Sequence, residues 1–417
     1  MITLIGYGVS GKATLDYFMK NGIFPTVRCE KEAALPERIK GIFGDGYLDT
    51  VEDVIFRSPS IRPDRIRGNG KITTEASFAL GISDAFKVGV TGSDGKSTTS
   101  TLIYKILEKS HKAYLGGNVG NALINFAPYA ENSSFVVAEL SSFQLIDFSS
   151  SLDTCVVTNI TQNHLDWHLS FDEYVCAKKN IVSHSDTNIL NYDDDLVKTF
   201  ANKNTTFFSL KNKRPENCAH FVALSDGYIT YDGVKVISAD KILLRGKFNL
   251  QNVMAAIGVT YNIAPIEDIR SVLMSFSGIA GRMEFVKKVG GVSFFDSSID
   301  TTPSRTTATL SAFDNPKTVV ILGGYDKNLS YDILKSSLYG IKYAVVCGSN
   351  KDKILKSIND VCPCTAENGF ENAVFAAYEK AVEGDSVLLS PASASFDMFS
   401  NYKERSAAFR KIVESLK

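Results

Sequence analysis

The sequence has almost no net charge and no long hydrophobic run. Its formal net charge is −1, which argues against a surface built for nucleic acid or an anionic membrane but leaves room for local anion sites. No apolar run approaches the ~18 residues that a membrane-spanning helix needs. The first residues, Met1-Ile-Thr-Leu-Ile-Gly6, lead directly into a glycine turn and lack the form of a signal peptide. We therefore expect no nucleic-acid partner, no membrane insertion and a cytoplasmic location.

Paired cysteines and low-complexity linkers are also missing. The seven cysteines are scattered, and Cys362 and Cys364 are one residue too close for a C-x-x-C motif. This pattern indicates reduced thiols rather than disulfides or a zinc site. A chain of 417 residues is too long for a single hydrophobic core. At about 150 residues per domain, this length predicts three domains.

The most informative motif is Val88-Gly-Val-Thr-Gly-Ser-Asp-Gly-Lys-Ser-Thr-Thr99. A strand, a glycine turn, Lys-Ser/Thr and a helix together form a phosphate-binding loop, because freed backbone N–H groups and the helix dipole favour an anion. Lys96 offers a charge for a terminal phosphate, and Ser97 offers a hydroxyl for magnesium. Val90 stands where the usual motif has its first glycine. The alternative is a glycine-rich turn with an exposed lysine, but the flanking strand and helix favour phosphate binding.

A second glycine motif opens the chain. Three glycines in a G-x-G-x-x-G pattern follow a predicted strand at Ile2–Ile5 and precede a predicted helix from about Lys12 to Asn21. In a βαβ unit this pattern places a nucleotide pyrophosphate at the helix N-terminus, although the pattern alone is a weak signal. Glu30 follows the next strand, where such folds place a ribose-binding acid. A nicotinamide dehydrogenase would share this motif but would not explain the loop at Lys96.

Strand-like and helical runs alternate along the rest of the chain, which predicts an α/β fold with mainly parallel sheets. We expect a Rossmann-like domain at residues 1–86, a central P-loop-ATPase-like domain at 87–278 and a Rossmann-like domain at 279–417. Within the central domain, Phe207–Lys241 has short strands and Asp-Gly turns and predicts a small antiparallel insert. The strands predicted in the last domain are Val292–Asp296, Thr318–Leu322, Tyr343–Cys347 and Ser386–Leu389.

Glu139 ends a predicted buried strand in the run Ala138-Glu-Leu-Ser-Ser-Phe-Gln144. A buried carboxylate is costly unless it is paired or bound to a metal. Glu139 is therefore a candidate magnesium ligand at the carboxyl edge of the sheet. The alternative is a carboxylate that caps the next helix.

Two histidines, His164 and His168, are spaced i, i+4 in a run that follows another strand. Zinc is disfavoured because the H-E-x-x-H glutamate and a nearby cysteine pair are both missing. His164 is a candidate single ligand or substrate contact, and a hydrogen-bonded turn histidine is the alternative.

Lys178 lies on a predicted helix after this run. A lysine facing a magnesium site must be displaced, neutral or converted by carbon dioxide to a carbamate, which could bind a hard cation as a carboxylate does. The alternative is an ordinary exposed helix lysine.

Several motifs occur in one order along the chain: TGSDGKST, AELSSFQL, TNITQNHLDWH, a following lysine, GRME, LGGYDK and SPASASFDMF. Together they resemble the Mur ligases of peptidoglycan synthesis over essentially the whole chain. GGYDK and SPASASFDMF are most similar to the members that add D-glutamate to UDP-N-acetylmuramoyl-L-alanine. The resemblance implies an ATP-dependent acid–D-amino-acid ligase that acts through an acyl phosphate, releases ADP and phosphate, and works as a monomer.

The resemblance also implies roles for individual residues. Lys96, His164 and Lys178 would be catalytic, and two Mg²⁺ ions would be held by Ser97, Glu139, His164 and a carbamylated Lys178. ATP would be bound by Gly92, Ser93, Asp94, Gly95, Lys96, Ser97, Thr98, Asn249, Asn252, Arg282 and Asp296. UDP-N-acetylmuramoyl-L-alanine would bind to residues 1–86 and also contact Asn118 of the central domain, and D-glutamate would bind to residues 279–417. The implied substrate contacts are Gly8, Ser10, Glu30, Ser58, Asn118, Thr301, Lys327, Ser395, Phe396 and Tyr402.

The sequence departs from the family pattern after Asp296. The usual Asp-Ser-Lys-Ala-Thr-Asn reads Asp-Ser-Ser-Ile-Asp-Thr-Thr here, so Ser298 replaces a lysine and either Thr301 or Thr302 would contact D-glutamate. Cys29-Glu-Lys31 stands where the family often has Asp-Thr-Arg, which leaves the uracil contacts open. The alternative functions are another Mur ligase, a folylpolyglutamate synthase, or a nucleotide-binding module without catalysis.

Overall fold

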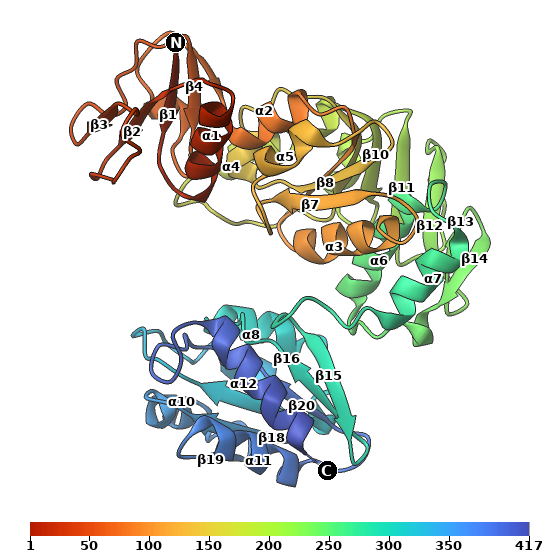
Figure 1. Cartoon of the computed structure of the whole chain (residues 1–417). Helices are drawn as coiled ribbons and strands as arrows, with labels where there is room; N and C mark the ends of the chain where they lie inside the picture. The colour runs from red at the N-terminus through yellow and green to blue at the C-terminus, as the bar shows by residue number, and fades with distance from the viewer. Residues whose placement is uncertain (417) are drawn as a thin grey trace. The chain divides into compact units, whose positions relative to one another are not determined.

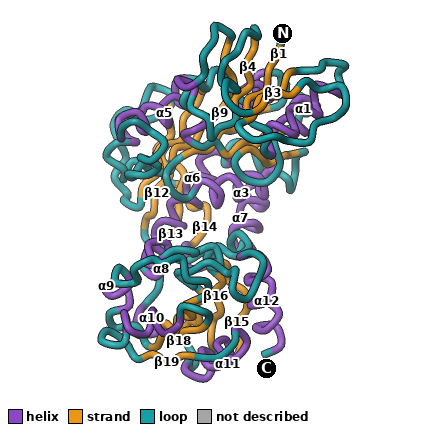
Figure 2. Tube along the Cα trace, turned by 90° about the vertical axis from the view of Figure 1, so that its left-hand side faces the viewer, coloured by secondary structure: helices purple, strands orange, loops and turns teal. Residues whose placement is uncertain are grey.

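The computed structural model describes residues 1–416, and this part of the chain holds three β-sheets built mostly from parallel strands. This arrangement confirms the expected α/β fold (Figures 1 and 2). The chain divides into two compact units: unit 1 comprises residues 1–239 and 251–273, and unit 2 comprises residues 240–250 and those from 274 onward.

The first sheet belongs to unit 1 and has five parallel strands in the order β3-β2-β1-β4-β5. Apolar side chains cover both of its faces, one cluster around Phe18 of α1 and another around Ile55. The helix predicted from about Lys12 begins earlier, at Val9, because Gly8 already serves as its N-cap. The elements are β1 Ile2–Ile5, α1 Val9–Lys20, β2 Thr26–Cys29, β3 Gly41–Phe43, β4 Val54–Arg57, β5 Lys71–Thr73 and α2 Glu75–Gly81.

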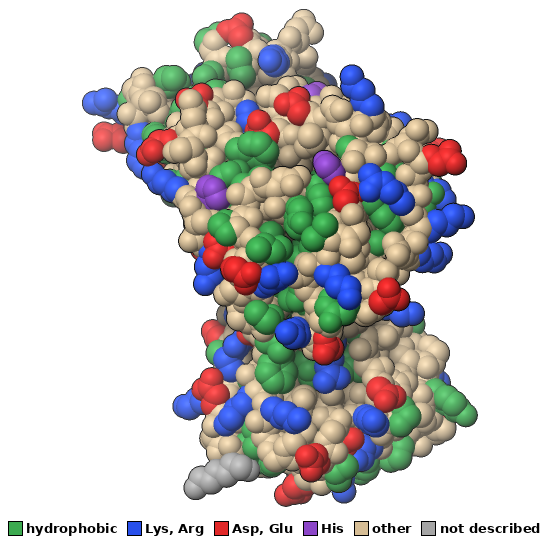
Figure 3. All heavy atoms as spheres, turned by 90° about the vertical axis from the view of Figure 1, so that its right-hand side faces the viewer, with side chains coloured by type: hydrophobic (Ala, Val, Ile, Leu, Met, Phe, Trp, Pro, Cys, Tyr) green, Lys and Arg blue, Asp and Glu red, His purple; other side chains and the backbone are tan. Residues whose placement is uncertain are grey.

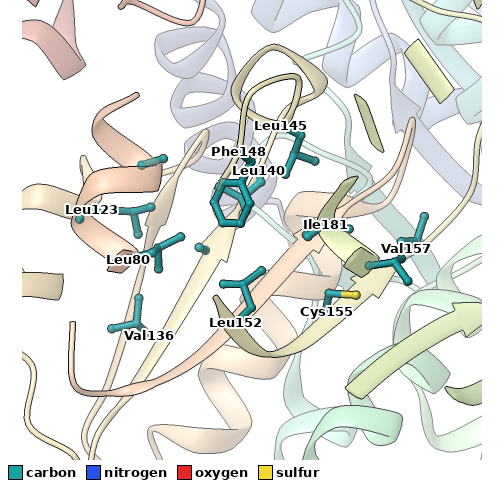
Figure 4. Close-up of a cluster of buried hydrophobic side chains, with 14 of the residues drawn as sticks. Leu80, Leu123, Val136, Leu140, Leu145, Phe148, Leu152, Cys155, Val157 and Ile181 are labelled. Atoms are coloured by element: carbon teal, nitrogen blue, oxygen red, sulfur yellow. The ribbon is translucent and has the colours of Figure 1, made fainter. Parts of the chain in front are cut away.

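The second sheet also belongs to unit 1 and has the order β14-β13-β12-β11-β10-β9-β6-β8-β7. β6 precedes the phosphate-loop motif and is flanked by β9 and β8. Leu140, Val157 and Ile181 belong to the buried cluster packed against these strands (Figure 4). The elements are β6 Phe86–Thr91, α3 Lys96–Leu107, β7 Ala113–Gly117, β8 Phe135–Glu139, α4 Ser142–Leu145, β9 Leu152–Val157, α5 Phe171–Ser183, β10 Ser185–Asn191, β11 Thr205–Ser209, β12 His220–Ser225, β13 Tyr228–Tyr231, β14 Val234–Ser238, α6 Lys247–Thr260 and α7 Ile266–Ser275.

The segment Phe207–Lys241 extends this sheet, and the prediction of a small antiparallel insert was wrong for its first half. β11 pairs parallel with both β10 and β12, and only β12, β13 and β14 pair antiparallel. Asp226 and Asp232 adopt positive φ in the two tight turns, as Asp-Gly turns allow. The turns were visible in the sequence, but the pairing of β11 was not, because it depends on the buried edge that β10 offers.

The third sheet lies in unit 2 with the order β15-β16-β20-β17-β18-β19. One cluster packs α11 and α12 against one face, and another packs α8, α9 and α10 against the other. The structure contains the predicted strands and adds the two edge strands, β15 and β19. The elements are β15 Glu284–Val289, β16 Val292–Asp296, α8 Pro303–Leu310, β17 Thr318–Gly323, α9 Leu334–Leu338, β18 Tyr343–Cys347, α10 Lys351–Ile358, β19 Cys364–Ala366, α11 Phe370–Lys380, β20 Ser386–Leu389 and α12 Tyr402–Ser415.

None of the described helices is both long and apolar enough to cross a bilayer. On the face drawn in Figure 3, Lys and Arg side chains are interspersed with Asp and Glu rather than gathered into a field of one sign.

Glu75 links α2 to the short helical turn Leu123–Asn125 that follows β7. Its Oε1 accepts a hydrogen bond from the Ile124 backbone N–H at 2.7 Å, and only 6% of the residue is exposed. Burial raises the pKa of Glu75 from the usual 4.5 to about 7, although backbone N–H groups partly oppose the shift. At neutral pH this carboxyl group is thus close to its own titration point.

We expect Glu75→Gln to remove a pH-dependent loss of stability. Between its unfolded pKa of 4.5 and its folded pKa of about 7, Glu75 holds its proton only in the folded state, so stability falls as pH rises. Above that range the free energy of unfolding of the wild type has fallen by about 3 kcal/mol relative to that of the variant. Urea unfolding of both proteins from about pH 5 to about pH 8 measures the difference. Glu131→Gln, at an exposed carboxylate, is the control, and a pH-independent difference for Glu75→Gln would contradict the expectation.

Candidate active site

The phosphate-loop motif forms a tight turn between β6 and α3. Gly92 has φ +146° and Gly95 has φ +81°, values that favour glycine. A Cβ at Gly92 would lie 1.8 Å from Thr158 Oγ1, and one at Gly95 would lie 2.2 Å from Asn252 Oδ1. Gly95 is the N-cap of α3 and offers no side-chain acceptor, so the first N–H groups of the helix suit an anion.

Two lysines converge on this turn. Lys96 Nζ donates to the carbonyl oxygens of Gly92 at 2.9 Å and Ser93 at 2.8 Å. Lys178 Nζ donates to the same Gly92 oxygen at 2.7 Å. Positive charges on both lysines would repel each other at this oxygen, so the site favours a bound anion or the loss of a proton from one lysine.

Lys178 is buried, which rules out the alternative of an exposed helix lysine. It lies on α5 with 2% of its surface exposed, and its ammonium group is 4.9 Å from the centre of the Tyr174 ring. Burial and then the charge of Lys96 hold the pKa of Lys178 well below its usual value, while Asp94 and Glu139 oppose the shift. Lys178 therefore loses its proton more readily than an exposed lysine does, and the deprotonated amine is the form that reacts with carbon dioxide.

Glu139 ends β8 next to β6 and is almost completely buried, with 1% exposed. Its Oε1 accepts a hydrogen bond from Asn118 Nδ2 at 2.8 Å, whereas its Oε2 has no hydrogen-bond partner among residues 1–416. The following helix α4 is capped by Ser141 and Gln144 instead, so the capping alternative was wrong. A buried, half-satisfied carboxylate suits a magnesium ligand.

His164 and His168 have different roles in the structure. The His164 ring packs edge-on against Phe143 at 4.9 Å between centroids. Loss of hydration, then the charges of Lys178 and Lys96, lower the pKa of His164, which favours the neutral ring that can bind a metal. His168 has both ring nitrogens engaged, Nδ1 with Glu173 Oε2 at 3.1 Å and Nε2 with Ser142 Oγ at 2.9 Å.

Within residues 1–416, no three His, Cys, Asp or Glu side chains lie together as a complete metal site. A magnesium ion beside Glu139 would need further oxygen ligands, and the motif offers the Ser97 hydroxyl for this role. Ser97 and Thr98 are both buried in the first turn of α3.

The loop itself is held from two sides. Ser93 Oγ lies 2.7 Å from the Tyr174 hydroxyl, and the Asp94 N–H donates to Asn159 Oδ1 at 2.9 Å. Asn252 on α6 accepts a hydrogen bond from Thr99 Oγ1 at 3.2 Å, which places it beside the start of α3, and its contact with ATP stays a prediction. Asn249 lies one turn earlier on α6, where its Nδ2 donates to the Arg245 carbonyl at 2.7 Å.

The candidate residues of the first sheet follow its β-strands at the carboxyl edge. Gly8 is exposed, and a Cβ there would meet no atom within 4 Å, so the turn is open to a ligand. Ser10 lies in the first turn of α1, and Glu30 is exposed after β2. Ser58 Oγ lies 3.0 Å from Ser60 Oγ in the turn after β4.

Two arginines that flank this turn were missed by the sequence analysis. Arg57 is 2% exposed, and its Nε donates to Asp147 Oδ2 at 2.7 Å while its Nη1 donates to the Ile61 carbonyl at 3.0 Å. Arg62 Nη1 donates to Glu173 Oε2 at 2.8 Å. Both arginines therefore join the first sheet to elements of the second sheet. No local sequence pattern predicts these contacts, because the partners are far apart along the chain.

In unit 2 the candidate residues other than Arg282 lie at the ends of β16, β17 and β20 or after them, and these strands are neighbours in the third sheet and share a carboxyl edge. Arg282 lies just before β15. Thr301 and Thr302 are half-buried, Lys327 and Phe396 are exposed, Ser395 is buried, and Arg282 and Tyr402 are half-buried.

Asp296 is fully buried at the end of β16. Its Oδ1 accepts from the N–H of Ser298 at 2.8 Å and from its hydroxyl at 2.6 Å, and its Oδ2 accepts from the Ser406 hydroxyl. Burial raises its pKa. Oδ2 could accept a second hydrogen bond, but the side chain is fully buried, so a ribose contact would need the surrounding residues to move and that role stays a prediction. Ser298, which stands in place of the usual lysine, has become a partner of Asp296.

The loop, the two lysines and the half-satisfied Glu139 define a nucleotide-binding protein of the phosphate-loop class. Two family models match the chain, the Mur ligase middle domain over residues 90–260 and the Mur ligase, glutamate ligase domain over residues 281–393.

Full-length relatives agree with these matches. A UDP-N-acetylmuramoylalanine--D-glutamate ligase of Clostridium novyi is 35% identical over 100% of this chain and 96% of its own length, and one of Clostridium botulinum is 36% identical with the same coverage. The chain belongs to the Mur ligase family. ATP and magnesium are the cofactors that membership of this ATP-dependent family implies.

Solved structures support the fold. A UDP-N-acetylmuramate-alanine ligase of Thermotoga maritima matches with a TM-score of 0.62 and 18% identity over 99% of both chains. A MurF ligase of the same organism, solved with ADP, has a TM-score of 0.58 and 19% identity over 99% of this chain and 95% of that one.

Proposed function

We propose that the protein joins D-glutamate to UDP-N-acetylmuramoyl-L-alanine in an ATP-dependent reaction of cytoplasmic peptidoglycan precursor synthesis. The observation that carries the proposal is the convergence of Lys96 and Lys178 on the Gly92 carbonyl, at the sheet edge where the buried Glu139 Oε2 has no hydrogen-bond partner within residues 1–416. The full-length likeness to relatives that bear this activity in their names supports the choice of substrates.

The reaction begins with two negative groups. The L-alanine carboxylate of the UDP-sugar attacks the γ-phosphorus of ATP, the bond to ADP breaks, and an acyl phosphate forms. The D-glutamate amine then attacks the acyl carbon, phosphate leaves and the amide remains. Repulsion between the carboxylate and the phosphate must be offset by cations held in place beforehand.

Lys96 supplies one such cation in this proposal, because its ammonium group already lies at the mouth of the loop. Magnesium would be held by Ser97 and Glu139, where it would neutralise phosphate charge. The N–H groups at the start of α3 would orient the phosphates.

A second magnesium would be held by His164 and by Lys178 in its carbamylated form. The low pKa of Lys178 supports this role, because the neutral amine adds carbon dioxide, loses a proton and becomes an anionic ligand. The two ions would supply positive charge that offsets the repulsion between the phosphate and the attacking carboxylate.

The substrates would be divided among three domains. Residues 1–86 would bind the UDP-sugar through Gly8, Ser10, Glu30 and Ser58, and residues 87–278 would bind ATP. Residues 279–417 would bind D-glutamate, with Lys327 as the partner of a carboxylate. The protein would act as a monomer.

Phosphate release in single-omission assays tests the proposal. We expect release only when ATP, Mg²⁺, UDP-N-acetylmuramoyl-L-alanine and D-glutamate are all present. Activity with L-lysine, meso-diaminopimelate or a folate but not with D-glutamate would overturn the choice of acceptor. ATP binding without any phosphate release would instead indicate a non-catalytic module.

A further inference from the structure

Arg62 lies in the loop after β4, next to the turn proposed to hold the UDP-sugar, but its side chain reaches across to the second sheet. Its Nη1 and Nη2 donate to Glu173 Oε2 and Oε1 at 2.8 and 2.9 Å. Nη1 also donates to the Trp167 carbonyl at 2.9 Å. The side chain is only 12% exposed, so this is not an ordinary surface ion pair.

Trp167 completes the contact from the other side. Its Nε1 donates to the Ser60 carbonyl at 2.9 Å, within the turn that contains Ser58. The Arg62 guanidinium lies 5.1 Å from the centre of the indole ring, and Phe143 packs against the same ring at 4.4 Å between centroids. We call Ser60, Arg62, Trp167 and Glu173 the Arg62 junction.

The Arg62 junction leads directly to the candidate metal ligands. Trp167 follows His164 in one turn, with its N–H donating to the His164 carbonyl at 3.1 Å. Glu173 lies on α5, the helix that carries Lys178. Glu173 also contacts His168, which bonds Ser142 at 2.9 Å on the helix directly after Glu139. Arg62 is therefore connected to the turn that carries His164 and to α5, which carries Lys178, and through His168 to α4, which begins three residues after Glu139.

The electrostatics keep the junction charged. Arg62 is the main cause that lowers the pKa of Glu173 to about 2, and Glu173 and Asp64 in turn raise the pKa of Arg62. A bidentate pair with fixed geometry transmits orientation better than a single contact, because both partners are held in one plane.

We propose that Arg62 is a positioning residue that couples binding of the UDP-sugar at the Ser58–Ser60 turn to binding of the divalent cation at His164 and Glu139. The proposal deepens the proposed function and rests on it for the identity of the UDP-sugar. The coupling is reciprocal, so each ligand raises the affinity of the other by the same factor.

The chain supplies its own reporter for this coupling. Trp167 is the single tryptophan of the sequence, and it lies inside the Arg62 junction. Intrinsic fluorescence therefore reports on the junction without a contribution from other indoles. In the wild type we expect UDP-N-acetylmuramoyl-L-alanine to change the emission of Trp167 and to bind about tenfold more tightly when Mg²⁺ is saturating.

The variants Arg62→Gln and Arg62→Lys test the residue itself. In Arg62→Gln we expect the Mg²⁺ concentration for half-maximal turnover to rise by about 10- to 100-fold, with the KM for D-glutamate unchanged and the Mg²⁺-dependent gain in UDP-sugar affinity lost. Arg62→Lys keeps the positive charge but cannot form the bidentate pair with Glu173, so its Mg²⁺ requirement should lie between those of the wild type and Arg62→Gln. Arg67→Gln is the matched control, since Arg67 is exposed and pairs with Asp49 on the same sheet, and it should behave as the wild type.

Two results would overturn the proposal. One is an equal affinity of wild-type protein for the UDP-sugar with and without Mg²⁺, a measurement that needs no variant to fold. The other is an unchanged Mg²⁺ requirement in a folded Arg62→Gln protein. Failure of the proposed function is distinguishable, because it would appear as no phosphate release by wild-type protein whatever the fluorescence shows.

Discussion

Lys96→Ala is expected to lower turnover by about 10³-fold while leaving the fold intact. Lys96 is the ammonium group proposed to neutralise the migrating phosphoryl group, and its side chain already lies across the mouth of the loop. Loss of Lys96 also removes a like charge that depresses the pKa of Lys178, so the variant should unfold at no lower urea concentration than the wild type.

Phosphate release and urea unfolding, measured on the same preparation, check this expectation. Lys105→Ala is the control on the same helix, because the Lys105 side chain is 44% exposed and pairs only with Glu108 among the ion pairs of the described chain. Turnover of Lys96→Ala within about tenfold of the wild type would refute the role of Lys96 at the phosphoryl group.

Lys178→Ala is expected to lower turnover by at least about 10²-fold, and an added small carboxylate such as formate or acetate should restore part of the loss. The alanine leaves a space where a carboxylate can take the place of the carbamate. Rescue should depend on the concentration of the carboxylate and should be absent with chloride at equal ionic strength.

The neighbouring Lys179→Ala is the matched control, since Lys179 is exposed and packs over the Phe200 ring. It should retain activity and show no response to formate. If Lys178→Ala loses activity without rescue, the carbamate is wrong but the ligase assignment stands. If Lys178→Ala keeps full activity, Lys178 has no part in the reaction.

The sequence predicted those parts of the site that depend on local pattern. The phosphate loop was recognisable because strand, glycines and Lys96 are contiguous, and Glu139 was found because a carboxylate at the end of an apolar strand is unusual. Both positions lie at the same edge of the second sheet, as the parallel order of β6 and β8 requires.

The contacts that were missed are remote in the sequence. Arg62 lies 111 residues before Glu173 and 105 before Trp167, so no local pattern could pair them. The burial of Lys178 could not be predicted either, because an exposed and a buried lysine look alike in a helix of mixed polarity. The edge strands β15 and β19 were not predicted either, because two consecutive lysines interrupt the apolar pattern of β15 and β19 has only three residues.

The enclosed guanidinium of Arg57 restricts how this polypeptide can be recombined. Its counter-ion, Asp147, belongs to the chain beyond residue 86, so a chimera that replaces only the first 86 residues must keep an arginine at the matching position. Without that arginine the Asp147 carboxylate would lose its counter-ion, which would lower the free energy of unfolding by about 3–5 kcal/mol. Natural exchange of the amino-terminal lobe between homologous enzymes would therefore select for joint inheritance of these two distant codons.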